Sequence, residues 1–245
     1  MRVLLVGGSG YVGTMCMPHL KPQFDLRVLD LVPPNDPSVE SVQGSVQDTD
    51  AVRRALEGME AVVYMAMARF PDGKYDCRTI DANYDVHVKH LHRVLQCAAE
   101  AKIARTVYTS SMSVHAYPPG GVYPSEDVPC NAPDVYGFTK WLGELVCEHF
   151  VRVRNMAVVS LRLNMPMPLE DWRESCQPGR PTTPAAAPDV ASAIALGLTV
   201  PLTGFHTVFI SGDYEGKLVN CSRAKQVLGW EPRERPRGPA PRAAG

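Results

Sequence analysis

The fold is decided at the start of the chain, by Arg2-Val3-Leu4-Leu5-Val6-Gly7-Gly8-Ser9-Gly10-Tyr11-Val12-Gly13. Residues 2–6 form a short apolar run rich in Val and Leu, which is typical of a parallel strand buried on both faces. Glycines follow, and we expect a helix through Leu20. The spacing Gly8-x-Gly10-x-x-Gly13 matches the dinucleotide fingerprint, in which glycines allow a tight turn and close approach to a pyrophosphate. Taken alone, the match is equally consistent with a strand-to-helix turn that binds no ligand.

The next stretch makes a dinucleotide site the better interpretation. Residues 26–29 read as a second strand that ends at Asp30. An acidic residue about 20 positions after the glycines can accept hydrogen bonds from the adenosine ribose, and it would repel a 2′-phosphate. The sequence therefore predicts NAD as the cofactor, in preference to NADP.

The rest of the chain continues to alternate strands with helices. Further strands are expected at 39–44, 61–66, 106–111, 158–163 and 207–211, and helices at 48–57, 83–101, 137–151, 189–198 and 222–228. This alternation predicts an α/β fold with a doubly wound parallel sheet of the Rossmann type. Ligands bind such sheets at the carboxyl ends of the strands, so 44–46 and 65–67 are expected to line the cofactor cleft.

A possible chemical site lies on the helix expected at 137–151 and the strand before it. Tyr136 and Lys140 are four positions apart, so they share one helix face. A phenol has an ordinary pKa of about 10 and needs a nearby positive charge to act as a base at neutral pH. Lys140 can supply that charge. Ser111 ends the strand 106–111 and is expected to hold a substrate oxygen near Tyr136.

Three histidines on the helix expected at 83–101 raise the question of a metal. His87, His90 and His92 have no acidic or cysteine partner at ligand spacing, so we predict no metal site and expect interface or surface histidines. The seven cysteines contain no Cys-x-x-Cys pair, which argues against both zinc and a disulfide framework and favours a reducing, cytoplasmic location.

Composition limits the partners. The 245 residues are 45% hydrophobic and 21% charged, with a formal net charge of −1. This balance gives no electrostatic footprint for nucleic acid or an anionic membrane. No apolar run approaches the roughly 20 residues that cross a bilayer. We expect neither a nucleic acid nor a membrane as partner.

The regular pattern weakens after residue 163. We expect a Rossmann domain at 1–163 that includes the catalytic residues, a small substrate-binding region at 164–230, and a disordered tail at 231–245 rich in Pro, Arg and Ala. The proline-rich stretch 166–188 is interpreted as a substrate-covering loop.

Together these motifs resemble the extended short-chain dehydrogenase/reductase family, also called the NAD-dependent epimerase/dehydratase family. The resemblance covers most of residues 1–232 and rests on the order of Gly7-x-x-Gly10-x-x-Gly13, Asp30, Asn83, Thr109-Ser110-Ser111, Tyr136-x-x-x-Lys140, Leu161-Arg162 and Leu228-Gly229-Trp230-Glu231-Pro232. The chain is most similar to the compact, uronate-dehydrogenase-like members.

The resemblance implies a role for each matching residue. Tyr136 would be the general acid/base, Lys140 would lower its pKa and bind the nicotinamide ribose, and Ser111 would hydrogen-bond the reacting oxygen. The residues implied to bind NAD are Gly7, Gly10, Tyr11, Val12, Gly13, Asp30, Ser45, Val46, Ala66, Met67, Tyr136 and Lys140. Ser45 departs from the acidic residue that the family usually has there. Met112-Ser113 replace the Asp-Glu pair of family dehydratases, so a dehydratase is disfavoured.

Three functions stay open. The leading one is an NAD-dependent oxidoreductase that acts on a sugar or sugar acid by hydride transfer; the alternatives are a sugar or nucleotide-sugar epimerase and a non-catalytic NAD-binding scaffold. The resemblance also implies a homodimer, with Val86, Val94, Leu142 and Val146 either at its interface or packed on the sheet. Polar residues expected near the substrate are Arg162, Asn164, His115 and Arg173.

Overall fold

The computed structural model describes residues 1–68, 77–178, 180 and 182–236. Its strands are β1 (Arg2–Val6), β2 (Asp25–Asp30), β3 (Glu40–Gln43), β4 (Ala61–Tyr64), β5 (Arg105–Ser111), β6 (Ala157–Leu163) and β7 (Gly204–Ile210). Its α-helices are α1 (Tyr11–Leu20), α2 (Thr49–Leu56), α3 (Ile80–Tyr84), α4 (Leu91–Glu100), α5 (Val135–Arg154), α6 (Leu169–Ser175), α7 (Ala187–Thr199) and α8 (Ser222–Leu228). A π-helical turn, η2 (Asp85–His90), joins α3 to α4, and short 3₁₀ turns occur at η1 (Cys77–Thr79), η3 (Met112–Val114) and η4 (Pro119–Gly121).

The described strands form one parallel sheet in the order β3-β2-β1-β4-β5-β6-β7. The chain builds outward from β1 to β3, returns to β4 beside β1, and then builds outward the other way. This reversal leaves a crevice at the carboxyl ends of β1 and β4, where open sheets of this kind bind ligands. The predicted doubly wound Rossmann-type sheet is confirmed.

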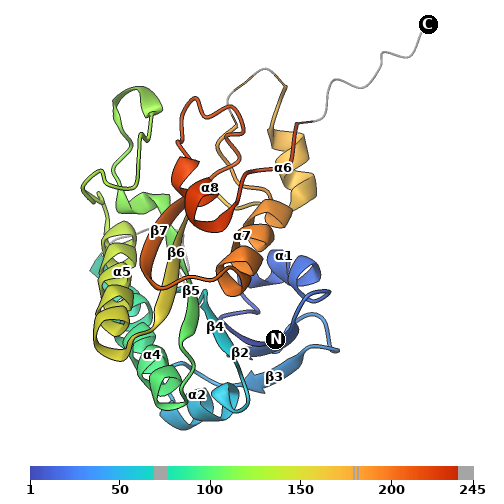
Figure 1. Cartoon of the computed structure of the whole chain (residues 1–245), viewed down its shortest axis with the longest axis vertical. Coiled ribbons are helices and arrows are strands. Elements are labelled where there is room, and N and C mark those ends of the chain that lie inside the picture. Colours follow the sequence, from blue (N-terminus) through green and yellow to red (C-terminus); the bar gives the residue numbers. More distant parts are fainter. Residues whose placement is uncertain (69–76, 179, 181, 237–245) are drawn as a thin grey trace, which may run out of the picture.

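Helices cover both faces of the sheet (Figure 1). One core cluster packs α1, α7 and α8 against one face, and a second packs α2, α4 and α5 against the other. The strands supply both clusters with alternate residues, as in Leu4 and Leu5, which are both fully buried. Burial on both faces explains why the central strands β1 and β4 carry continuous apolar runs.

Segments that follow β6 fold over the carboxyl end of the sheet. Within 166–188, which the sequence indicated as a loop, α6 buries Trp172 and its indole N–H donates to the Pro184 carbonyl at 2.8 Å. The buried Asp189 of α7 accepts hydrogen bonds from the backbone N–H groups of Arg233 and Glu234 at 2.9 and 3.1 Å. The strap of residues 230–234 is thereby tied to α7.

Most predicted elements are observed within a few residues of their expected bounds. The single helix expected at 83–101 is instead α3, η2 and α4 in succession. Strand β7 extends the main sheet, and the division into 1–163 and 164–230 stays a prediction. Of the tail expected to be disordered, residues 233 and 234 are held by Asp189, residues 231–236 form no helix or strand, and 237–245 lie outside the described residues.

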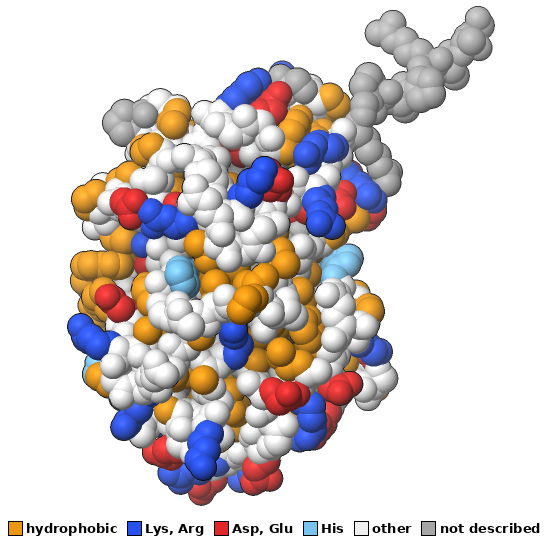
Figure 2. Space-filling view, in the orientation of Figure 1, with side chains coloured by type: hydrophobic (Ala, Val, Ile, Leu, Met, Phe, Trp, Pro, Cys, Tyr) orange, Lys and Arg blue, Asp and Glu red, His pale blue; other side chains and the backbone are white. Residues whose placement is uncertain are grey.

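Charges of both signs are intermixed on the face shown in Figure 2. Within the described ranges, no helix combines the length and apolar character that a membrane span requires.

Candidate active site

A cleft of about 1180 Å³ opens at the carboxyl ends of the strands. Its walls come from the turns after β1, β2, β3 and β4, from η2, and from α5. Nearly all of the predicted site residues line it: Gly7, Gly10, Tyr11, Val12, Asp30, Ser45, Val46, Ala66, Met67, Ser111, Tyr136 and Lys140. Gly13 is not among the lining residues, because it packs behind the wall against Gly8.

The glycine turn shapes one end of this cleft. Gly7 has φ +80°, and a Cβ there would lie 2.5 Å from the Ala66 Cα. A Cβ on Gly13 would lie 2.2 Å from the Gly8 oxygen, so α1 starts directly against the turn. Gly10 caps α1 without a side-chain hydrogen bond, and the first turn holds no acidic residue. A helix start of this kind leaves N–H donors for a phosphate, so the cradle fits the pyrophosphate of a dinucleotide.

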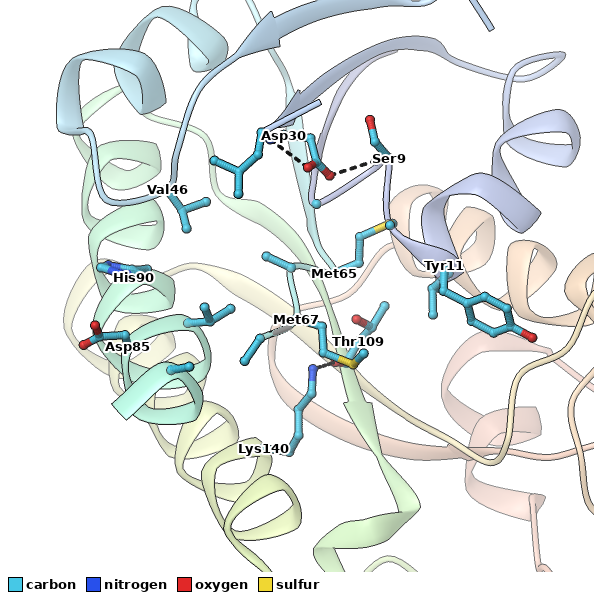
Figure 3. Close-up of a pocket in the computed structure, with 18 of the residues that line it drawn as sticks. Ser9, Tyr11, Asp30, Val46, Met65, Met67, Asp85, His90, Thr109 and Lys140 are labelled. Atoms are coloured by element: carbon cyan, nitrogen blue, oxygen red, sulfur yellow. Dashed lines mark hydrogen bonds between the residues drawn. The ribbon is translucent and has the colours of Figure 1, made fainter. Parts of the chain in front are cut away.

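Asp30 stands beside this turn at the end of β2. Its Oδ2 accepts a hydrogen bond from the Ser9 N–H at 3.0 Å, and its Oδ1 accepts from the Leu31 N–H at 2.7 Å (Figure 3). A carboxylate has about four acceptor sites, so capacity remains for ribose hydroxyls. The position and chemistry of Asp30 therefore fit the adenosine half of NAD.

Residues of η2 form a wall that the sequence analysis missed. Asp85, Val86 and His90 line the cleft opposite the glycine turn. Figure 3 shows Asp85 and His90 on the same side of the cleft as Val46. Arg93 Nη1 donates to the Val46 carbonyl at 3.2 Å and bonds His90 Nδ1 at 2.7 Å, which ties this wall to the segment after β3. No spacing in the sequence distinguishes a π-helical turn from the α-helices around it.

The start of α5 places Tyr136 in the cleft wall, which Ser111 also lines. The Asp134 carboxylate caps α5 by accepting from the Gly137 N–H at 2.8 Å. A Cβ on Gly137 would lie only 1.9 Å from the Ser113 oxygen, so α5 begins in direct contact with η3. Ser111 Oγ accepts a hydrogen bond from the Ser113 N–H at 3.1 Å. The turn that ends β5 and the first turn of α5 are thereby held together in the cleft wall.

Lys140 lies one helical turn after Tyr136 and is almost fully buried. Its Nζ donates to the Thr109 carbonyl at 2.8 Å, as drawn in Figure 3, and lies 5.9 Å from the centre of the Tyr136 ring. Burial lowers the pKa of Lys140 to about 7, although Glu144 and Cys147 partly oppose the change. A lysine with this pKa changes charge near neutral pH beside a phenol.

Some predicted residues lie elsewhere. His87 and His90 are buried, so the expectation of surface or interface histidines is wrong for both; they belong to η2, and their Nδ1 atoms contact Thr139 of α5 and Arg93 of α4. His92 is exposed, as expected. Among the described residues, no cluster of three or more His, Cys, Asp or Glu side chains is arranged to hold a metal.

The four polar residues considered for the substrate do not line the cleft. These residues are Arg162, Asn164, His115 and Arg173. Arg162 uses all five of its N–H donors: Nε and Nη2 bind the Glu144 carboxylate at 2.9 and 2.8 Å, and the other three reach His115 Nε2, the Glu126 carbonyl and Cys130 Sγ. Arg173 pairs with Glu170 and Glu234. The Arg162 guanidinium therefore has no donor left for a substrate carboxylate.

Comparison with known proteins bears on the function of this cleft. The family model described as "NAD dependent epimerase/dehydratase family" matches residues 3–167. The undecaprenol-linked N-acetylglucosaminyl-diphosphate 4-epimerase of Escherichia coli O157:H7 is 30% identical over 150 residues, which are 61% of this chain and 43% of that enzyme. L-arabinose 1-dehydrogenase (NAD(P)(+)) of Haloferax volcanii is 26% identical over 185 residues, covering 71% of this chain and 70% of the relative.

The chain spans about two-fifths of the length of the first curated relatives it matches. Among solved structures, the uronate dehydrogenase of Agrobacterium tumefaciens has a TM-score of 0.77 with 22% identity, and the match covers 95% of this chain and 84% of that one. At this identity the likeness shows a shared fold.

Proposed function

Because the chain belongs to the NAD-dependent epimerase/dehydratase family, we propose that it is an NAD-dependent oxidoreductase that oxidises a hydroxyl of a sugar or sugar acid by hydride transfer. The observation that carries the proposal is one cleft lined by the glycine cradle, Asp30, Ser111, Tyr136 and Lys140.

In this proposal one end of the cleft binds the adenosine and pyrophosphate of NAD, and hydride transfer takes place at the other end. The turn at Gly7 and Gly10 and the start of α1 bind the pyrophosphate, and Asp30 binds the adenosine ribose. Ser45, Val46, Ala66 and Met67 line the remaining cofactor surface. When bound, the nicotinamide accepts a hydride from the substrate carbon.

Tyr136 is the proposed general base. Its phenolate takes the proton of the substrate hydroxyl, and Ser111 Oγ holds the same oxygen. The Lys140 ammonium favours the phenolate by its charge. One of its three hydrogens goes to the Thr109 carbonyl, which leaves two for the cofactor ribose.

Relatives that act on sugars support a sugar substrate, and they include both a dehydrogenase and an epimerase. A 4-epimerase and an arabinose dehydrogenase both match this chain. An epimerase would use the same residues and return the hydride to the opposite face of the substrate. If the substrate is a sugar acid, its carboxylate needs a partner other than Arg162, because the donors of Arg162 are all occupied.

We also propose a homodimer. On α5, Phe138, Leu145 and Val153 are 38, 42 and 48% exposed, which is a high exposure for apolar side chains. Val94 and Val146, named from the sequence as candidates, pack in the core cluster instead. A dimeric mass in light scattering is expected, and a monomeric mass at micromolar concentration would reject the proposal.

The test is to follow reduced-nicotinamide absorbance with NAD and a panel of aldoses, uronic acids and nucleotide sugars. Accumulation of reduced cofactor supports the dehydrogenase; conversion of a sugar to its epimer without accumulation supports the epimerase. NAD binding with neither outcome supports the non-catalytic scaffold.

Tyr136→Phe should lower kcat by about 10²- to 10⁴-fold, the usual contribution of a general base. Tyr214→Phe is the control, because Tyr214 packs under Arg235 and does not line the cleft. Undiminished turnover by Tyr136→Phe on every substrate would refute the proposed mechanism.

A further inference from the structure

The turn η2 packs the buried His87 against α5, on the face that carries the proposed catalytic residues. A Cβ on Gly143 of α5 would lie 2.9 Å from the His87 oxygen, so the two segments are in close backbone contact. π-helical turns inside longer helices occur frequently at functional sites. His87 is fully buried and has no part in the mechanism above.

The hydrogen bonds of Thr139 define the tautomer of His87. His87 Nδ1 lies 2.9 Å from Thr139 Oγ1. The single hydroxyl hydrogen of Thr139 is directed at carbonyls of its own helix, those of Val135 at 2.8 Å and Tyr136 at 3.1 Å. We assign the Thr139 hydrogen to one of these carbonyls, which makes Nδ1 of His87 the donor and leaves a lone pair on Nε2. That Nε2 is buried and makes no hydrogen bond within the described structure.

His90 shows that this arrangement is not a general property of the turn. Arg93 can only donate, so its 2.7 Å bond makes His90 Nδ1 the acceptor and puts the hydrogen on Nε2. The two buried histidines of η2 therefore have opposite tautomers. Each is set by its partner outside the turn.

His87 also contacts Tyr136 directly. The two rings meet edge to face, with centroids 5.6 Å apart. Thr139, which holds His87 Nδ1, lies between Tyr136 and Lys140 in the same helical turn. Burial, and then the charge of Lys140, lower the pKa of His87 well below its ordinary value, so the imidazole stays neutral at pH 7.

We propose that His87 is a positioning residue: as a neutral Nδ1–H imidazole it holds Thr139 and meets the Tyr136 ring edge to face, which fixes the phenol in the cleft. This inference rests on the proposed function. It concerns the orientation of Tyr136, which can be measured without a substrate.

The variants His87→Asn and His87→Gln distinguish the role of Nδ1 from that of Nε2. The Asn amide can replace the Nδ1 donor, whereas the Gln amide reaches the Nε2 position. Because displacement of a reacting group by about 1 Å can cost 10²-fold, we expect kcat to fall about 10- to 100-fold in His87→Gln and His87→Leu and within about 3-fold in His87→Asn. The dissociation constant of NAD should stay within about twofold of wild type in all three.

Two further variants complete the kinetic test. Thr139→Val removes the partner, so adding it to His87→Asn should abolish the rescue. His92→Asn is the matched control, because His92 is an exposed histidine on α4. Wild-type kcat in His87→Leu, or equal rescue by Gln and Asn, would overturn the proposal. If His87→Leu does not fold, the Asn and Gln pair still decides.

NMR tests the same proposal without turnover. The ¹⁵N imidazole signals that disappear in His87→Asn are those of His87. From pH 6 to 8 they should report hydrogen on Nδ1 and none on Nε2. Loss of the imidazole ring current shifts the ring resonance of ¹³C-labelled Tyr136 in both His87→Asn and His87→Gln, so repositioning is expected as a larger shift in His87→Gln than in His87→Asn, and as a shift in Thr139→Val, which keeps the imidazole. An Nε2–H tautomer, or a Tyr136 resonance that shifts equally in His87→Asn and His87→Gln and does not move in Thr139→Val, would overturn the inference. Absence of turnover on the whole panel would instead count against the proposed function.

Discussion

Two buried cations lie near the Glu144 carboxylate, and they differ in their hydrogen-bond partners and in the direction of their pKa shifts. Lys140 and Arg162 are 3 and 4% exposed. Arg162 has a bidentate bond to Glu144 and a partner for every remaining donor, whereas Lys140 donates a hydrogen bond to the neutral Thr109 carbonyl. Burial lowers the pKa of Lys140 to about 7. Burial also acts against the Arg162 charge, but the bonds and charge of Glu144 outweigh it and raise the pKa of Arg162.

The difference separates a structural cation from a chemical one. Arg162 joins β6, α5 and the loop before α5, and its saturation leaves nothing for a ligand. Lys140 lines the cleft with donors left over and a charge that changes near neutral pH. A buried charge without a counter-ion costs stability, and such costs are concentrated at functional sites.

The largest effect should come from breaking the structural pair. Glu144→Leu leaves Arg162 buried without its counter-ion, so we expect a loss of about 3–5 kcal/mol in unfolding free energy. Urea denaturation followed by circular dichroism measures it. Glu148→Gln, at an exposed position one turn later, should change stability by less than about 0.5 kcal/mol. A small loss in Glu144→Leu would mean that Arg162 finds another partner.

Removing Lys140, the chemical cation, should raise the unfolding free energy instead of lowering it. Lys140→Met ends the burial of a charge, and we expect a gain of about 1–3 kcal/mol in unfolding free energy at pH 6, together with loss of turnover. The folded pKa of Lys140 is about 7 and the ordinary value is 10.5. Between these values the unfolded chain binds more protons, so wild-type stability rises with pH. The advantage of Lys140→Met should therefore shrink from pH 7 towards pH 10; an advantage independent of pH would contradict this account.

The smallest effect should come from a cation that is paired at the surface. Arg173 bonds Glu170 at 2.7 Å and approaches Glu234 at 3.6 Å, and both acids are partly or well exposed. Arg173→Met should cost less than about 1 kcal/mol, and less still in 0.5 M salt. A larger loss would show that the strap of residues 230–234 depends on this pair as well as on Asp189.

The sequence predicts the sheet well because its signal is local. A continuous apolar run followed by glycines marks β1, and a β-branched and aromatic run that ends in hydroxyl residues marks β5, each to within one residue. The glycine spacing and the Tyr136–Lys140 pair fall on the cleft for the same reason. These are contacts between near neighbours or between strand ends that the topology brings together.

What the sequence does not disclose depends on distant partners. Arg162 is a plausible carboxylate ligand until Glu144, 18 residues earlier, is seen to occupy it. His87 and His90 are at helical spacing from the buried Val94, but a histidine is buried only where it has a partner, and their partners are Thr139, 52 residues later, and Arg93. Helix α6 was missed because prolines surround a short helix whose stability comes from burying Trp172. The roles of Ser111, Tyr136 and Lys140, and the homodimer, stay predictions.

The strap of residues 230–234 has a consequence for synthesis on the ribosome. Asp189 is buried and its pKa is raised by burial, while its backbone partners lie 44 and 45 residues later in the chain. As α7 emerges, this carboxylate must stay hydrated, so we expect α7 to remain loosely attached to the sheet until residues 233 and 234 have left the ribosome. Stalled nascent chains in which residues 233 and 234 are still held inside the ribosome should expose the apolar face of α7 to chaperones, and chains in which an added C-terminal linker brings them outside should not.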